Sequence, residues 1–140
     1  YSAANNRRID AKYLLKPIQD EVLNLIAKAY AEETTLDKTA AYPVVAADNK
    51  KTITNNGAGA QVILTLPAAT AGKEFHFYVA AAFNLRMLAV GTDTIRLGAT
   101  VSAAAGYVEN AVIGSFITLR CLHAGLWICP GRLMGAWTVV

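Results

Sequence analysis

Cys121 and His123 are the residues whose types and spacing come closest to a catalytic pair. A cysteine thiolate is a nucleophile, and a histidine beside it can act as its base. Here the two residues fall on a predicted strand and the turn that follows, with no third group to orient the histidine and no evident oxyanion donors. Both residues are therefore predicted to be structural.

Other polar residues give no catalytic or metal-binding pattern. His76 and His123 stand apart, with no carboxylate or cysteine at a spacing typical of metal ligands. Asp93 and Glu109 do not form a recognisable acid and base pair, and no glycine-rich phosphate loop precedes a helix. We therefore expect no enzymatic activity, no cofactor and no metal.

Cysteine and tryptophan residues near the carboxyl end favour structural roles as well. Cys121 and Cys129 have apolar neighbours, which predicts buried thiols rather than a disulfide. Trp127 and Trp137 could form an aromatic platform for a sugar, although core or subunit contacts are the favoured interpretation. Four arginines could face an acidic partner or be single outward charges: Arg86, Arg96, Arg120 and Arg132.

Length and composition predict one domain that meets a partner. The chain has 140 residues, of which 54% are hydrophobic and only 16% charged. Soluble monomers carry more charge, so some apolar surface is expected to contact another protein. The net charge of +3 is too small to indicate nucleic acid. No run of 18 apolar residues is present, which argues against a membrane-spanning helix.

The stretch Gln61–Val79 has the alternation of two strands joined by a turn at Pro67 and Gly72, which predicts a β-hairpin. Further short strands are expected at 42–47, 52–54, 85–90, 94–97, 115–121, 126–129 and 137–140. ETTLDKTA is predicted to be a connector, and Gly98–Gly106 a loop against a neighbour. The predicted core contains Phe75, Phe77, Ile117, Leu119 and Trp127.

A single helix is predicted for Pro17–Glu33, where apolar residues recur at steps of three and four. Its contact residues are expected to be Ile18, Val22, Leu25 and Ile26. The 4-3 spacing extends over only about two heptads, fewer than a coiled coil needs. Two hypotheses therefore remain for this helix: it packs on the β domain, or it forms a short bundle with its copies around a symmetry axis.

The fold class that follows is mainly β, an antiparallel sandwich or jelly roll preceded by one α-helix. Residues 1–40 are assigned to an amino-terminal arm and helix for attachment or oligomerisation, and residues 41–140 to an antiparallel β domain. The polar arm contains Arg7 and Arg8, and it is either a docking arm or an ordinary frayed terminus.

Several dipeptides in the last 85 residues or so resemble a β domain that recurs in tailed-bacteriophage virion proteins. The matching positions are Leu66-Pro67, Ala71-Gly72, Asp93-Thr94-Ile95, Gly114-Ser115, Trp127 and Trp137. The resemblance implies a structural virion protein, most simply a trimeric capsid decoration or head-fibre protein bound to the major capsid protein or another virion protein. It would be assembled in the cytoplasm of the host bacterium, without nucleic acid or membrane as partner. A tail or tail-fibre component is the near alternative, and a carbohydrate-binding module is a more distant one.

Overall fold

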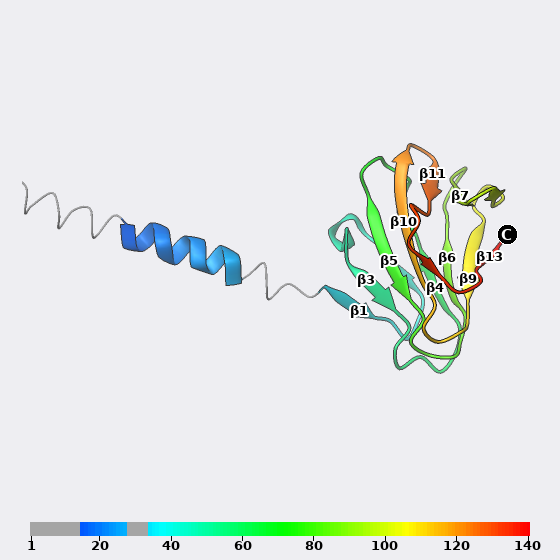
Figure 1. Ribbon diagram of the computed structural model, residues 1–140, viewed down its shortest axis with the longest axis horizontal. Coiled ribbons are helices and arrows are strands. Elements are labelled where there is room, and N and C mark those ends of the chain that lie inside the picture. The colour runs from blue at the N-terminus through cyan, green and yellow to red at the C-terminus, as the bar shows by residue number, and fades with distance from the viewer. Residues whose placement is uncertain (1–14, 28–33) are drawn as a thin grey trace, which may run out of the picture. The chain divides into compact units, whose positions relative to one another are not determined.

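A computed structural model describes residues 15–27 and 34–140 of the chain. The chain divides into two units, 1–33 and 34–140, which are treated separately. In the first unit, residues 15–27 form the amino-terminal helix (Figure 1). The remainder of the predicted helix, 28–33, lies outside the described residues.

The second unit consists of two β-sheets that face each other (Figure 1). Sheet A has eight strands in the order β1-β3-β5-β10-β11-β7-β8, with β12 also paired to β10, and sheet B has the order β13-β9-β6-β4-β2. The strands are β1 Thr35–Asp37, β2 Tyr42–Pro43, β3 Thr52–Thr54, β4 Val62–Thr65, β5 Glu74–Tyr78, β6 Leu85–Leu88, β7 Thr94–Leu97, β8 Thr100–Val101, β9 Tyr107–Asn110, β10 Phe116–His123, β11 Leu126–Ile128, β12 Leu133–Met134 and β13 Thr138–Val139. The expected mainly β sandwich with one helix before it is confirmed.

The first six strands wind between the two sheets as a flattened coil. β1, β3 and β5 pair in parallel in sheet A, while β2, β4 and β6 pair in parallel in sheet B. Each strand therefore crosses to the other sheet before the chain returns to pair with the strand two places earlier. The sheets are mixed, whereas purely antiparallel pairing was expected.

The predicted hairpin at Gln61–Val79 is wrong, although both of its strands form. β4 pairs with β2 and β6 in sheet B, and β5 pairs with β3 and β10 in sheet A. Alternation with period 2 only says that each strand has one buried face. The pattern is the same whether the two strands pair in one sheet, as in a hairpin, or lie in opposite sheets and face each other across the core, as in an arch. Alternation therefore does not distinguish a hairpin from an arch.

The second half of the chain closes the coil with mostly antiparallel strands. β10 pairs with β5 along Phe116–Arg120, and its other edge pairs with β12 and then β11. In sheet B, β9 pairs with β6 and β13 pairs with β9. In Figure 1, β5 and β10 lie side by side although they are far apart in sequence.

Four strands lie where the sequence predicted none. β1 falls in the stretch expected to be a connector, β8 falls in the Gly98–Gly106 loop, and neither β9 nor β12 was predicted. β1 and β8 are short and lie at sheet edges. The strand expected at 42–47 ends after Pro43, and a 3-10 helix follows at Ala46–Asp48. The strand lies on the edge of sheet B, where a proline is tolerated because it cannot donate to a further strand.

The space between the sheets is filled as predicted. All five expected core residues have 0% exposure: Phe75, Phe77, Ile117, Leu119 and Trp127. They meet the inward residues of sheet B, among them Leu64, Leu85 and Met87. The Phe75 and Trp127 ring centroids are 5.7 Å apart, at an interplanar angle of 47°.

A buried asparagine joins consecutive turns of the coil. Asn55 follows β3 and has 0% exposure. Its Oδ1 accepts hydrogen bonds from the backbone N–H groups of Ala80 and Ala81, at 2.8 and 2.9 Å. Its Nδ2 donates to the carbonyl oxygens of Ala81 and Phe83, at 3.1 and 2.9 Å. One side chain thus satisfies four backbone groups of the segment between β5 and β6.

We predict that Phe77→Ala lowers the free energy of unfolding by about 3 to 5 kcal/mol, because it leaves a cavity in the core. The matched control is Tyr78→Ala, the next residue along β5, whose side chain is 36% exposed. It should cost less than about 1.5 kcal/mol. Urea denaturation of both variants checks this, and equal losses would contradict the inward placement of Phe77.

Asn55→Ala should destabilise the protein by about 2 to 4 kcal/mol, since it strands buried backbone donors and acceptors. Asn56→Ala, at the exposed neighbouring position, is the control and should change stability by less than about 1 kcal/mol. Thermal unfolding measures the difference. A loss at position 55 no larger than that at position 56 would show that the four hydrogen bonds do not hold the coil together.

Candidate binding surfaces

The residues that resembled a catalytic pair do not form one. Cys121 is buried, and its Sγ lies 3.1 Å from the backbone carbonyl oxygen of His123 rather than from the imidazole ring. Burial raises the pKa of the Cys121 thiol, which lowers the fraction of thiolate. Both Cys121 and Cys129 are free, as expected, although Cys129 is only half-buried.

The other polar candidates are also engaged in structural contacts. Nδ1 of His76 lies 2.8 Å from Oγ1 of Thr118, and its ring stacks on Phe116 at 6.0 Å. A carboxylate oxygen of Asp93 accepts a hydrogen bond from the Ala69 N–H at 2.7 Å. Within residues 15–27 and 34–140, no cluster of three or more His, Cys, Asp or Glu residues forms a possible metal site.

The two tryptophans do not form an exposed aromatic platform. Trp127 is fully buried, and its indole N–H has no hydrogen-bond partner in the described part of the chain. Trp137 is half-buried against the core, and its Nε1 donates to the Met134 carbonyl oxygen at 3.0 Å. The interpretation of both as packing residues is therefore the one that fits their positions.

The four arginines lie on different surfaces of the β unit. Arg86 lies on sheet B, whereas Arg96 and Arg120 lie on sheet A, and Arg132 is in the exposed segment before β12. They do not gather into one basic patch. The hypothesis that they jointly face an acidic partner loses its geometric basis.

The amino-terminal helix carries a row of exposed apolar side chains. The predicted contact residues Ile18, Val22, Leu25 and Ile26 are 59%, 47%, 61% and 46% exposed. Leu15, one step earlier in the same 4-3 spacing, is 56% exposed. Arg7 and Arg8, the other predicted contacts, lie outside the described residues. No helix among the described residues has the length and hydropathy needed to cross a membrane.

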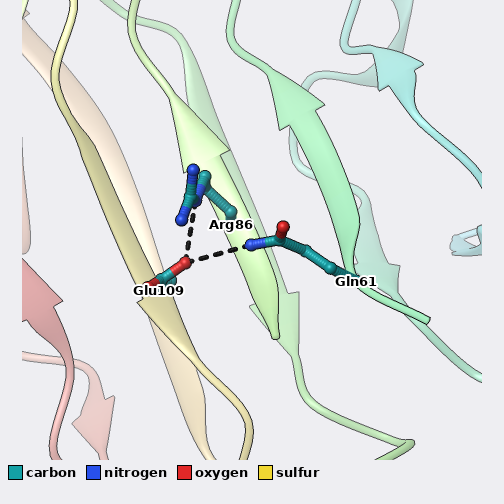
Figure 2. A network of polar contacts seen from close by, with 3 residues as sticks. All are labelled: Gln61, Arg86 and Glu109. Carbon is teal, nitrogen blue, oxygen red and sulfur yellow. Dashed lines mark hydrogen bonds and ion pairs between the residues drawn. The ribbon is translucent and has the colours of Figure 1, made fainter. Parts of the chain in front are cut away.

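The outer face of sheet B contains a polar network that the sequence analysis did not identify (Figure 2). Nε of Arg86 on β6 donates to Oε2 of Glu109 on β9 at 2.8 Å. Nε2 of Gln61, just before β4, donates to the same oxygen at 3.2 Å. The Arg86 guanidinium also lies over the Tyr107 ring, 3.7 Å from its centroid.

This network holds the arginine side chain flat against the sheet. Its hydrogen bond with Glu109 is the main reason why the pKa of Arg86 is raised above its ordinary value. The side chains of Arg86 and Glu109 are 25% and 16% exposed. Arg86 and Glu109 are 23 residues apart in the sequence, so only the pairing of β6 with β9 brings them together.

We predict that a thiol reagent modifies Cys129 of the native protein at least about 100-fold faster than Cys121, since Cys121 becomes accessible only when the fold opens. Mass spectrometry of peptides after timed labelling measures both rates. The Cys121→Ser variant is the control and should leave the fast phase unchanged. Rapid labelling of Cys121 at neutral pH would contradict its burial.

Comparisons with known proteins leave the family open. No protein-family model matches the chain, and no curated protein or solved structure gives a significant match.

Proposed function

We propose that this protein is a non-enzymatic structural component of a tailed-bacteriophage virion, most specifically a capsid decoration or head-fibre protein. It is a homotrimer that attaches to the shell through the amino-terminal part of residues 1–40, before β1, and leaves the β domain outward. Its partners are the major capsid protein or another virion protein, and neither nucleic acid nor membrane takes part. Its place is the virion, assembled in the cytoplasm of the host bacterium.

The observation that carries the proposal is the row of apolar side chains on the amino-terminal helix. Leucine and isoleucine side chains more than half exposed on one helical stripe are costly in water unless an apolar surface covers them, and we assign that surface to another protein. The stripe follows a 4-3 spacing, which suits a short bundle of identical helices or a groove on a shell protein. The motif resemblance of the β domain adds the virion context.

The β unit suits a passive, outward role. Its sheets enclose a continuous apolar core. The polar side chains of His76 and Asp93 contact other residues of the fold. Further apolar side chains at the surface, including Val112 at 67% and Met134 at 65% exposure, leave room for additional protein contacts. A tail or tail-fibre position would use the same stripe and is the alternative that the experiment must separate.

Leu25→Glu should lower the occupancy of the protein on purified shells at least about 10-fold, because it places a charge in the apolar stripe. Asn24→Glu adds the same charge at the neighbouring position, about 100° around the helix and outside the apolar stripe, and should bind as the wild type does. Pelleting of shells mixed with each protein measures occupancy.

Deletion of residues 1–16 extends the same test to the arm that contains Arg7 and Arg8. Binding should be weakened while circular dichroism still reports the β unit intact. Full occupancy by both Leu25→Glu and the deletion variant would place the docking surface elsewhere. Retention of the intact protein by purified tails and not by shells would replace the capsid assignment with the tail or fibre alternative.

A further inference from the structure

The turn after β3 contains the one asparagine of the sequence that is followed by glycine, which is Asn56 before Gly57. The backbone N–H of Ala58 donates to the carbonyl oxygen of Asn55 at 3.0 Å and closes the turn around this pair. Gly57 has a φ of 81°, the positive value that a type II turn requires at its third residue. Asn56 and Gly57 are both exposed, so water and base reach the pair.

The surroundings of this pair leave its reactive atoms free. The N–H of Gly57 has no hydrogen-bond acceptor among residues 15–27 and 34–140, so base can remove its proton. Glycine has no Cβ to hinder the approach of its nitrogen to the side-chain carbon of the residue before it. The Asn56 amide is held by one exposed hydrogen bond, from its Nδ2 to Oδ2 of Asp37 at 3.3 Å. Asn55, by contrast, is buried and held by four hydrogen bonds.

The exposed amide also belongs to a clamp that holds β1 on β3. Asp37 ends β1, and its Oδ1 accepts a hydrogen bond from Oγ1 of Thr54 on β3 at 2.6 Å. The same Thr54 oxygen accepts from the backbone N–H of Asn56 at 3.1 Å. β1 has three residues and pairs only with β3, at the edge of sheet A. Few other contacts within the sheet therefore hold this strand in place.

We propose that Asn56 is a site of spontaneous deamidation, and that the carboxylate formed there releases β1 from β3. After base removes the Gly57 amide proton, the nitrogen bonds to Cγ of Asn56. The bond from Cγ to Nδ2 breaks, and Nδ2 leaves as ammonia with a proton from water. Water then opens the cyclic succinimide at either of its carbonyl groups, which gives aspartate or isoaspartate.

The product reverses the chemistry of the clamp. A carboxylate faces Asp37 where an amide donor stood, and two like charges at hydrogen-bond distance repel each other. Among the described residues, Asp37 has no ion-pair partner to offset this repulsion. The ammonium of the adjacent Lys38 lies over the Tyr42 ring, 3.8 Å from its centroid. Release of β1 leaves the edge of β3 unpaired, and unpaired strand edges are templates for further pairing.

This reaction needs no enzyme or partner, and it does not rest on the proposed virion function. The first test is incubation of the full chain at mildly alkaline pH, followed by digestion and mass spectrometry of chromatographically separated peptides. Aspartate and isoaspartate should form at Asn56 at least about 10-fold faster than at Asn49, which is also exposed but precedes Lys50. The rate should rise with pH, because the deprotonated nitrogen attacks. Equal rates at the two positions would overturn the proposed site.

The second test measures release of β1 by hydrogen exchange of the Lys38 amide, which donates to the Thr54 carbonyl oxygen at 2.9 Å. Asn56→Asp mimics one product, and Asn56→Ala is the matched control that removes the side-chain hydrogen bond without adding charge. Exchange should be at least about 5-fold faster in Asn56→Asp than in Asn56→Ala. The Leu66 amide, which donates to the Leu88 carbonyl oxygen in sheet B, should exchange equally in both variants.

A double variant separates repulsion from a general loss of stability. Asp37→Asn combined with Asn56→Asp exchanges the donor and the acceptor, so it should return Lys38 exchange to within about 2-fold of the wild type. Salt at about 1 M should also slow the exchange in Asn56→Asp, since it screens exposed charges. Equal exchange in Asn56→Asp and Asn56→Ala, or a double variant that exchanges as fast as Asn56→Asp, would overturn the release of β1 by charge.

Discussion

The structure depends on one constraint, which is that each short strand has a single apolar face that must be covered from across the core. Val62 and Leu64 on β4 and Phe75 and Phe77 on β5 are all fully buried, yet the two strands belong to different sheets. Crossing from sheet to sheet lets consecutive strands cover each other's apolar faces. The parallel pairing within each sheet follows, because the chain returns in the same direction after each full turn.

Polar groups then fix the register of this winding. Asn55 bonds four backbone groups of the segment between β5 and β6, which a purely apolar side chain could not do. The long strand β10 closes the coil by pairing with β5 on one edge and with β12 and β11 on the other. The result is a sandwich of two mixed sheets around one apolar core.

Much of the fold could be predicted from local patterns, whereas the pairing could not. Alternation identified β4, β5 and the buried set that includes Phe77, because burial of one face leaves a period of 2. It did not separate a hairpin from an arch, since both give the same period. β1 and β8 were missed because edge strands of two or three residues are too short for a period. The apolar stripe of the helix, at Ile18 and Leu25, could be predicted because the helix is long enough to show a period. The ion pair of Arg86 with Glu109 could not be predicted, because only the pairing of β6 with β9 brings the two residues together.

The winding of strands between sheets is tested most directly by the pattern of nuclear Overhauser effects between backbone protons of β4 and its neighbours. The account predicts contacts from Ile63 and Leu64 to Arg86 and Met87 on β6, in parallel register, and none of the ladder type to β5. An antiparallel ladder between Val62–Thr65 and Glu74–Tyr78 would contradict it, because β4 and β5 would then form a hairpin in one sheet.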